Sequence, residues 1–598
     1  MHKARKEFRS LIALDDAVSV VLGHSPVAGI EEVPLESALG RVLAEKAVSR
    51  ADVPGFDRAS MDGYAVVSGD TLDAREDRPT SLRLKGCVAT GAAPLFRIER
   101  GEAAEVSTGS VMPKGADAVV MIEYSYAGGE GKGERESDEV LVRRAAHASE
   151  NVQTAGSDIS FGETVLFSGK RLTAQDVGVL AALGQKLVRV RTVKVGITST
   201  GNELVPPGFP LGSGQIYDIN SYSIASAAEE CGATPIRYGI LPDEREAMKD
   251  SLCKMAHECD LVLVSGSTSA GAGDMIYQVL EEIGEMLFHG INLKPGKPTL
   301  FGIIDGKPCL GLPGYPTSAL TVFGLLAAPA IRKALGLKAR AKRRMGRLSR
   351  PVRAEGRQQM LAVGISGDVV YPADKGSGSI TTLAGADGFI EIPAEVEYLE
   401  RGSEVEVRLF GELEPPDLVM AGENSLLLDR LAESAPLKIR LLNTGSLLGI
   451  VHLQDGVADL ACVMGSVEPP EGMIVVERYE RELGLIFRDE ESPREIAKMR
   501  IVGWRRDSLM RAAFESALKD LGVANPRYDR LARSHSAVAA AVAAGMADLG
   551  FGERDAAVQA GLGFKLIRKD EIRLLMRAGE GEGHGLAEIL EILRATGK

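Results

Sequence analysis

The chain has 598 residues, and its 70 lysines and arginines against 83 aspartates and glutamates give a formal net charge of −13. At roughly 100–200 residues per domain, this length predicts about three to six domains, and 45% hydrophobic with 26% charged residues is typical of folded rather than disordered protein. The acidic balance and the aromatic content of only 5% disfavour a protein that binds nucleic acid or a membrane surface.

The cysteines and the apolar segments point to the cytoplasm. Six cysteines without a CxxC pair form no disulfide framework in a chain of this length. Asp15 and Asp16 interrupt the apolar run that a signal peptide needs. The longest apolar stretch, 319–331, is shorter than the roughly 20 residues of a membrane-spanning helix.

The N-terminal third predicts a stem with a small domain inserted into it. Apolar residues recur at helical spacing over 8–24, which indicates an amphipathic helix. Short β-prone runs separated by glycine and proline predict a β-domain over 60–149, and the flanking segments 1–59 and 150–190 are expected to form its stem. The glycine- and charge-rich tract 127–137 is expected to be an exposed hairpin loop.

The next segment, 191–337, alternates strands and helices, which predicts a parallel, doubly wound α/β sheet. Ligands of such sheets bind at the carboxyl ends of the strands. The expected strands are 193–198, 235–241 and 261–265, and the expected helices are 219–230, 245–257 and one from about 276.

Two further regions follow. The tract 338–350 carries seven basic residues and is read as an exposed linker or domain edge, with a nucleic-acid patch as the alternative. The β-rich, glycine-punctuated region up to 412 predicts a small β-barrel, so that a barrel domain spans 338–412. The segment 414–416 resembles a hinge, and 417–598 returns to an α/β pattern with strands at 438–442, 473–476 and 565–567.

The glycine-rich loop SGSTSAGAGD at 265–274 lies between an expected strand and an expected helix. Its backbone N–H groups and the helix dipole favour a phosphate site, although any tight turn between strand and helix explains the glycines equally well. Asp274 closes the loop, where a carboxylate is suited to hold Mg²⁺ beside a phosphate.

Charged residues next to other strand ends add to this candidate site. Lys294 and Lys297 stand on a segment stiffened by Pro295 and Pro298, which makes a merely solvated turn the weaker interpretation. Glu203 and Asp243 follow expected strands and point together to a site for a divalent metal or for hydroxyl groups. Each carboxylate alone is also typical of a helix cap.

Several of these segments form a specific combination of motifs, which resembles the MoeA family of molybdopterin molybdenumtransferases, related to the E domain of gephyrin. The resemblance covers about 8–411 in the family's domain order. The motifs are SMDGYAV at 60–66, TG at 108–109, PKGADAVV at 113–120, STGNEL at 199–204, GQIYDIN at 214–220, KPGKP at 294–298 and GLPGYP at 311–316.

The resemblance implies Mg²⁺-dependent insertion of molybdate, or equally tungstate, into adenylylated molybdopterin with release of AMP. It implies catalytic roles for Asp62, Glu203, Asp243, Asp274, Lys294 and Lys297, with Asp243 and Asp274 as metal ligands. The implied cofactor-binding residues are Thr108, Thr200, Gly201, Ser265, Gly266, Ser269, Gly271, Pro313, Gly314, Pro316 and Ser318. Family members are elongated homodimers in which the inserted β-domain completes the partner's cleft, and the molybdopterin adenylyltransferase is a further expected partner.

The chain departs from the family pattern in three places. Ser267 replaces the second glycine of the loop, and Met275 replaces the aromatic residue that usually follows the aspartate. The family's Asn-x-Arg-x-x-Gly-Glu-Asp segment reads NVQTAGSD at 151–158, so its arginine and glutamate are missing. The third departure puts one anion contact in doubt.

The C-terminal segments GSLLGI at 445–450, GVADLA at 456–461 and 534–552 resemble periplasmic-binding-protein-like domains for molybdate or tungstate. Such a bilobal α/β domain binds an oxyanion through hydroxyl and N–H groups at helix N-termini. Ser446 and Ser508 are the candidate oxyanion contacts, followed by Thr444 and Ser534, and simple N-capping is the alternative. His535 is also considered, although a single histidine is more often structural.

The sequence therefore predicts a cytoplasmic molybdenum or tungsten insertase fused to an oxyanion sensor or feeder domain, with no nucleic-acid or membrane partner. The alternative is an oxyanion-binding regulatory protein whose transferase site has drifted. The retained Asp62, Glu203, Asp274, Lys294 and Lys297 favour the enzyme, and the altered segment 151–158 favours the alternative.

Overall fold

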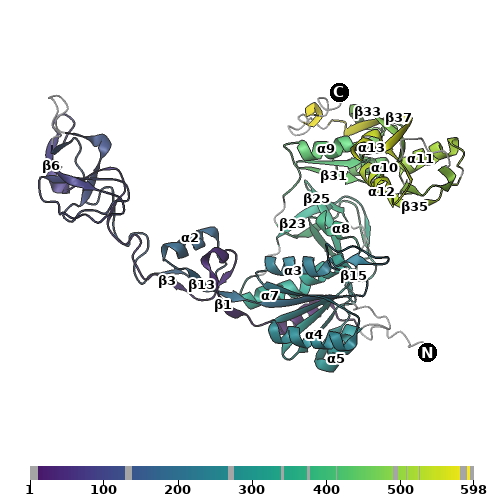
Figure 1. Cartoon of the computed structure of the whole chain (residues 1–598), viewed down its shortest axis with the longest axis horizontal. Helices are drawn as coiled ribbons and strands as arrows, with labels where there is room; N and C mark the ends of the chain where they lie inside the picture. The colour runs from purple at the N-terminus through teal and green to yellow at the C-terminus, as the bar shows by residue number, and fades with distance from the viewer. Residues whose placement is uncertain are drawn as a thin grey trace.

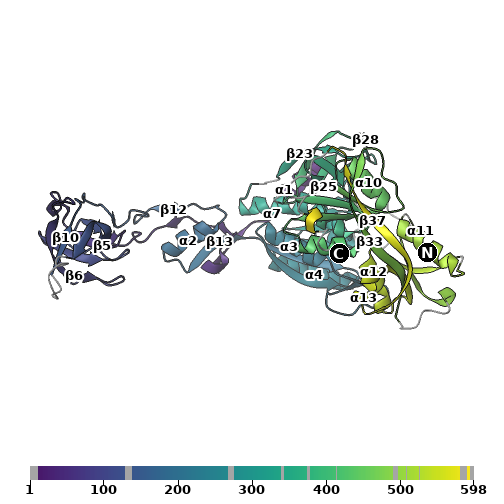
Figure 2. The ribbon, with the colours of Figure 1, turned by 90° about the horizontal axis from the view of Figure 1, so that it is seen from above.

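The computed structural model describes residues 11–127, 138–266, 275–338, 342–373, 378–411, 414–488, 496–506, 508–523, 525–579 and 589–592. It is an elongated α/β protein of several domains, which confirms the predicted class (Figures 1 and 2). A small β-domain lies at one end, and the larger domains gather at the other (Figure 1). The expected loop at 127–137 lies, apart from its first residue, outside the described residues.

The inserted β-domain is one six-stranded sheet of order β8-β5-β7-β6-β10-β9. Two short antiparallel ribbons, β3–β12 and β4–β11, connect it to the stem, whose own sheet has the order β1-β13-β2. The strands are β1 (Gly29–Pro34), β2 (Val42–Leu43), β3 (Ala47–Val48), β4 (Arg58–Ala59), β5 (Gly63–Val66), β6 (Thr80–Val88), β7 (Glu102–Val106), β8 (Ala118–Met121), β9 (Ser125–Ala127), β10 (Glu139–Val142), β11 (Val152–Gln153), β12 (Thr164–Leu166) and β13 (Leu187–Thr192). The stem helix α2 (Ala174–Ala182) begins at a capping box, in which the Thr173 hydroxyl and the Asp176 carboxylate each accept a hydrogen bond from the other residue's backbone N–H.

The central α/β domain has a six-stranded sheet of order β17-β14-β18-β22-β21-β19. Its elements are β14 (Lys194–Thr200), β15 (Leu204–Val205), β16 (Ile216–Tyr217), α3 (Asn220–Glu230), β17 (Thr234–Leu241), α4 (Arg245–Glu258), β18 (Leu261–Ser265), α5 (Met275–Ile283), β19 (Glu285–His289), β20 (Leu293–Lys294), β21 (Leu300–Ile304), β22 (Lys307–Leu312), α6 (Pro316–Val322), the π-helical η4 (Phe323–Ala327) and α7 (Ala328–Leu335). The first four strands of the sheet are parallel to one another. Strand β21 is antiparallel to β22, and β19 is antiparallel to β21, so the predicted parallel sheet is in fact mixed.

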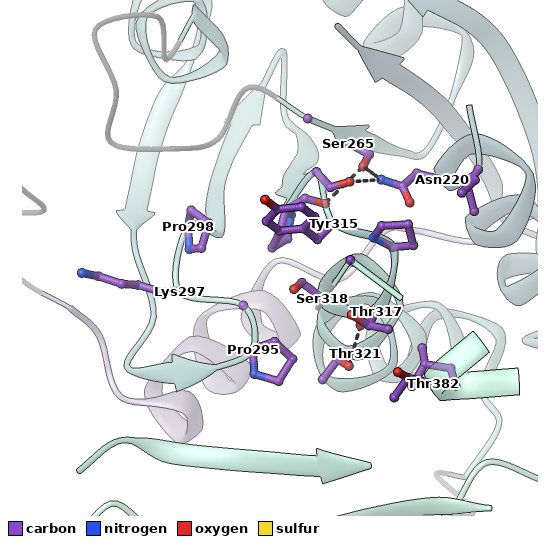
Figure 3. A pocket seen from close by; sticks show the side chains of 18 of the residues that line it. Asn220, Ser265, Pro295, Lys297, Pro298, Tyr315, Thr317, Ser318, Thr321 and Thr382 are labelled. Carbon is purple, nitrogen blue, oxygen red and sulfur yellow. Dashed lines mark hydrogen bonds between the residues drawn. The ribbon is translucent and has the colours of Figure 1, made fainter. Parts of the chain in front are cut away.

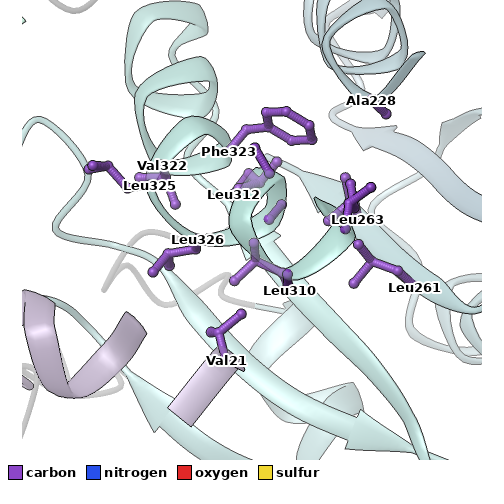
Figure 4. Close-up of a cluster of buried hydrophobic side chains, with 14 of the residues drawn as sticks. Val21, Ala228, Leu261, Leu263, Leu310, Leu312, Val322, Phe323, Leu325 and Leu326 are labelled. Carbon is purple, nitrogen blue, oxygen red and sulfur yellow. The ribbon is translucent and has the colours of Figure 1, made fainter. Parts of the chain in front are cut away.

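Helices cover both faces of this sheet, which is why every residue of β18 is buried. Residues of α3, α6, η4 and α7 pack on one face, and those of α4 and α5 pack on the other. Helix α1 (Leu14–Gly23) joins the first of these cores, where Val21 lies near Leu310 and Leu326 (Figure 4). The sequence had assigned this helix to the stem.

Within the described part of the chain, one helical segment, Pro316–Leu335, is long and apolar enough to cross a membrane by length and composition. It combines α6, η4 and α7, and 67% of its apolar window is buried inside the protein. This burial is typical of a core helix. Because α6 begins shortly after β22 ends, the start of α6 lies at the carboxyl end of that strand.

The next domain is a closed ring of five strands in which β23 pairs with β26, β26 with β25, β25 with β27, β27 with β29, and β29 with β23. The elements are β23 (Arg343–Leu348), β24 (Val352–Arg353), β25 (Gln358–Ser366), β26 (Val369–Pro372), α8 (Ile380–Ala384), β27 (Gly388–Ile392), β28 (Tyr398–Leu399) and β29 (Glu404–Leu409). Residues 343–348 of the basic tract therefore form a barrel strand rather than a linker, because this strand pairs on both sides.

The C-terminal domain contains an eight-stranded sheet of order β31-β30-β32-β37-β33-β36-β34-β35. Its elements are β30 (Leu418–Gly422), α9 (Leu426–Ser434), β31 (Ile439–Asn443), α10 (Ser446–Gln454), β32 (Leu460–Met464), β33 (Met473–Phe487), β34 (Ile501–Trp504), α11 (Leu509–Asp520), β35 (Tyr528–Ala532), α12 (His535–Ala543), β36 (Leu549–Glu553), α13 (Arg554–Gln559) and β37 (Gly563–Arg577). Two separate cores define a first lobe around β30–β32 and a second lobe around β34–β36. The paired strands β33 and β37, each 15 residues long, run through both lobes, whereas the sequence indicated only short pieces of them.

Candidate functional site

A cavity of about 1360 Å³ lies where the carboxyl ends of β14, β17, β18 and β22 meet the barrel. Many of the residues singled out in the sequence line it together: Thr200, Gly201, Glu203, Asp243, Ser265, Gly266, Lys294, Lys297, Pro313, Gly314, Pro316 and Ser318. Ser269, Gly271 and Asp274 lie outside the described residues. Segments up to about 120 positions apart in the chain thus converge on one site, as expected for strand ends at the same edge of a sheet.

Gly266 lets two strand ends approach each other at the edge of the cavity. Its φ is +112°, and a Cβ atom there would lie 2.4 Å from the carbonyl oxygen of Thr200. No side chain fits at that distance, so the glycine at the start of the loop has a steric reason that does not depend on a ligand.

Two buried polar residues hold the loops around the cavity. The side-chain amide of Asn220 donates to Ser265 Oγ at 2.7 Å and to the carbonyl of Gly314 at 2.8 Å (Figure 3). The Asp218 carboxylate accepts from Ser199 Oγ at 2.7 Å and from the backbone N–H of Ser221 at 3.1 Å, so that it caps α3. The motif GQIYDIN contains both residues, but the sequence singled out neither of them as a site residue.

Three buried polar atoms that line the cavity have no hydrogen-bond partner within the described part of the chain: Thr200 Oγ1, Asn220 Oδ1 and Gln359 Oε1. Leaving such an atom unpaired costs about 1–3 kcal/mol, so these atoms are natural contact points for a ligand. The amide nitrogen of Asn220 already donates hydrogen bonds to two protein groups, which fixes the orientation of the amide. Its oxygen is therefore available to a ligand as an acceptor.

The charged residues come from opposite sides of the cavity. Lys294 Nζ lies 2.8 Å from Glu355 Oε1 of the barrel, and this hydrogen bond lowers the pKa of Glu355. Figure 3 shows Lys297 beside Pro298 on one side of the pocket and Asn220 beside Ser265 on another. Glu203 and Asp243 add carboxylates to the same lining, but among the described residues no three histidine, cysteine or acidic side chains gather as a metal cluster.

The barrel supplies a wall that sequence reasoning missed. Arg357, Gln359, Met360 and Ala362 of β25 and its preceding turn line the cavity, together with Thr382 and Leu383 of α8 and Phe389 of β27. No local motif marks these residues, because they reach the site only through the packing of the barrel over the sheet edge.

Asp62 and Thr108 do not belong to this lining. The Asp62 carboxylate accepts hydrogen bonds from the amide and the hydroxyl of Thr108, and these bonds lower the pKa of Asp62. Both residues lie in the inserted β-domain, which Figures 1 and 2 place at the far end of the same chain. Within one chain the structure therefore divides the predicted site into two groups.

The two candidate oxyanion serines of the C-terminal domain have partners inside the protein. Glu423 Oε1 accepts from the amide of Ser446 at 2.9 Å and from its hydroxyl at 2.7 Å, at the N-terminus of α10. A carboxylate of the protein thus takes the place expected for an oxyanion. Ser508 caps α11 by accepting from Met510 N, and Ser534 caps α12 in the same way through Ala537 N.

The two lobes also cap each other's helices across their interface. Asn424 Oδ1 of the first lobe accepts from the amide of His535 at the start of α12, and Glu553 Oε2 of the second lobe accepts from Leu426 N at the start of α9. Arg481 on β33 pairs with Glu553 at 3.1 Å and with Asp570 at 2.9 Å, and all three side chains are buried. The domain's own polar and charged groups therefore pair with one another where the two lobes meet.

Comparisons with known proteins agree with this division of the chain. Four family descriptions match: the MoeA N-terminal region (domains I and II) over 12–184, a probable molybdopterin binding domain over 196–333, the MoeA C-terminal region (domain IV) over 346–410, and a PBP superfamily domain over 428–594. The first three together span the stem, the inserted domain, the α/β domain and the barrel.

Individual relatives match the same part of the chain. The molybdopterin molybdenumtransferase of Haemophilus influenzae is 35% identical over 332 residues, which cover 55% of this chain and 79% of the relative. That of Bacillus subtilis is 30% identical over 424 residues, which cover 68% of this chain and 96% of the relative. Two crystal structures of the molybdopterin biosynthesis MoeA protein from Pyrococcus horikoshii match with TM-scores of 0.58 and 0.52 at 42% and 33% identity, covering 68% and 67% of this chain and 100% of each structure.

Proposed function

Because the chain belongs to the MoeA family of molybdopterin molybdenumtransferases and has an enzymatic role in molybdenum cofactor biosynthesis, we propose that its cavity binds adenylylated molybdopterin and inserts molybdate or tungstate with release of AMP. One observation carries this proposal: lysines, carboxylates and three unpartnered buried polar atoms line a single cavity at the sheet edge. Such a lining suits a ligand that combines anionic groups with hydrogen-bonding ring atoms.

Charged and neutral side chains of the cavity would bind different parts of the substrate. Lys294 and Lys297 would neutralise the pyrophosphate and the incoming oxyanion. Thr200, Asn220 and Gln359 would orient the neutral part of the substrate through their free polar atoms. This mechanism requires no protein nucleophile, because the residues bind, orient and balance charge.

The donor chemistry of the cavity fits a magnesium ion, since Mg²⁺ prefers hard oxygen ligands. Glu203 and Asp243 supply carboxylates in the lining, and Asp274, which lies outside the described residues, is the second proposed metal ligand beside Asp243. When bound, the ion would offset the negative charge of the substrate's phosphates.

We further propose that the protein works as a cytoplasmic homodimer. Asp62 and Thr108 stand on a domain held away from the cavity of the same chain, which leaves them available to the cavity of a second copy (Figures 1 and 2). All six cysteines are free and four of them are buried, as is usual in a reducing compartment.

The test is turnover by the purified full chain with adenylylated molybdopterin, Mg²⁺ and either molybdate or tungstate. We expect AMP release that requires the oxyanion and is lost on addition of a chelator. Omission of the oxyanion is the control, and a folded protein that releases no AMP with either oxyanion would overturn the proposal.

A further inference from the structure

The C-terminal domain docks onto the barrel through Arg440 on its edge strand β31. Both terminal nitrogens of Arg440 donate to Asp387, one to each carboxylate oxygen and both at 2.8 Å. The Arg440 Nη1 atom also donates to the hydroxyl of Tyr371 at 3.1 Å and to the carbonyl of Ile365 at 3.3 Å. The side chains of Arg440 and Asp387 are only 20% and 11% exposed, so this bidentate pair is largely removed from water.

Asp387 is fixed within the barrel by two further bonds. Its carboxylate accepts from the amide of Ile365 at 2.7 Å, and its own amide donates to the carbonyl of Val363 at 2.8 Å. Asp387 therefore ties the connection between α8 and β27 both to β25 and to the C-terminal domain.

The two elements that this connection joins both contribute to the cavity wall. Thr382 and Leu383 on α8 line the cavity, as does Phe389 on β27, two residues after Asp387. Helix α8 packs against α6, and Figure 3 shows Thr382 of α8 and Thr321 of α6 in the lining of the same pocket. A shift of Asp387 would consequently move residues on both sides of it that face the substrate.

We propose that Arg440 is a positioning residue for the transfer reaction: by holding Asp387, the C-terminal domain fixes α8 and the start of β27 as a wall of the cavity. This inference rests on the proposed function of that cavity. It gives the C-terminal domain a role in the reaction that needs no ligand of its own, in agreement with Glu423 bonding to the candidate oxyanion residue Ser446.

The interface offers a matched control in Arg401. Arg401 pairs with Asp455 of the C-terminal domain at 3.0 Å, but its side chain is 60% exposed. Arg401 stands between β28 and β29, outside the α8–β27 connection. Removal of either arginine takes one ion pair from the same interface. Of the two, only Arg440 pairs with the connection between the elements that line the cavity.

The test compares Arg440→Ala, Arg440→Lys and Arg401→Ala in the full chain by two measurements. Hydrogen exchange is followed in 380–389, and the KM for adenylylated molybdopterin is measured from AMP release. We expect faster exchange in Arg440→Ala and a KM at least about fivefold higher with little change in kcat, partial restoration in Arg440→Lys, and no change in Arg401→Ala.

Exchange in 380–389 that is the same in Arg440→Ala and Arg401→Ala would overturn the inference. So would an unchanged KM in a variant whose exchange is faster. A wild-type chain without AMP release would instead remove the proposed function, and the exchange measurement would still decide whether Arg440 holds this segment. If Arg440→Ala does not fold, Asp387→Asn breaks the same pair without removing the arginine and replaces it in both measurements.

Discussion

Asp62 accepts two hydrogen bonds from Thr108, at 2.6 Å from its amide nitrogen and at 3.0 Å from its hydroxyl. These bonds stabilise the carboxylate and lower the pKa of Asp62. The pair is exposed on the inserted domain and distant from the cavity of its own chain (Figure 1). The Asp62–Thr108 pair can take part in the proposed reaction only if a second copy of the chain brings its cavity to this surface.

Mixed dimers test that arrangement. Asp62→Ala and Lys297→Ala are each expected to be inactive alone, because each damages both cavities of a homodimer. Co-expression of the two variants should restore about half of the wild-type activity in the mixed dimer, since one of its two cavities is then intact. The measurement is AMP release by tag-purified mixed dimers. A chain that is monomeric in light scattering, or mixed dimers as inactive as the parents, would contradict the shared site.

Lys294 is expected to contribute to turnover and little to stability. Its ammonium group faces the cavity and is only half-buried, so Lys294→Ala should lower kcat/KM by about 100-fold, as loss of one anion-stabilising donor does. Its ion pair with Glu355 is near the surface, and the Tm should change by no more than a few degrees.

Lys307→Ala is the matched control for that variant. Lys307 pairs with Asp260 at 3.2 Å at the start of β22, the end of the strand opposite the cavity. Its replacement should leave turnover unchanged. Equal rates for Lys294→Ala and Lys307→Ala would remove Lys294 from the site.

Acid should weaken the C-terminal domain through His535. Burial disfavours the charged ring and lowers the pKa of His535 from 6.5 to about 4, although Glu553 attracts the proton. Between these two values the unfolded chain binds a proton that the folded domain does not. Stability therefore falls as the pH drops from 6.5 towards 4, with a slope of at most about 1.4 kcal/mol per pH unit for one proton.

The only tryptophan, Trp504, makes this change measurable, because its ring lies 4.8 Å from that of His535 inside the same domain. Urea unfolding followed by Trp504 fluorescence at pH 7 and pH 5 should show the loss in the wild type and in the exposed-site control His24→Gln. His535→Gln should lose most of the pH dependence. The same slope in that variant would assign the titration to another group.

Ser446 is expected to make no contribution to oxyanion binding. Its amide and hydroxyl are both bonded to Glu423, and its hydroxyl also accepts from Met464 N at 3.1 Å. Calorimetric titration of the full chain with molybdate and tungstate should give the same affinity for wild type, Ser446→Ala and Ser508→Ala. A tenfold or larger loss of affinity for the oxyanion in either variant would instead support the oxyanion site that the sequence predicted.

The sequence was most informative where a local pattern has a local cause. The strand 261–265 and the helices at 219–230 and 245–257 were predicted to within a residue or two, because buried β-branched runs and helical periodicity are properties of neighbouring residues. Ser265, Gly266, Glu203 and Asp243 were placed at strand ends for the same reason, and the carboxyl ends of parallel strands in one sheet meet at the same edge.

The remaining features depend on contacts between distant segments. Nothing near Gln359 or Thr382 marks them as cavity residues, since only the closure of the barrel over the sheet brings them there. Similarly, the segment around Ser446 predicts an open anion site, and the carboxylate that takes its place comes from Glu423, which follows strand β30.

The sequence by itself thus determined an α/β protein of the MoeA family with a second α/β domain appended, and it identified the glycines, lysines and carboxylates of the sheet edge. Only the tertiary structure decided that Asp62 lies apart from Lys294, that Glu423 bonds to Ser446, and that Arg440 holds Asp387 beside the cavity wall. The physical reason is that periodicity and motif spacing report short-range preferences, whereas the pairing of buried charges depends on which distant surfaces exclude water together.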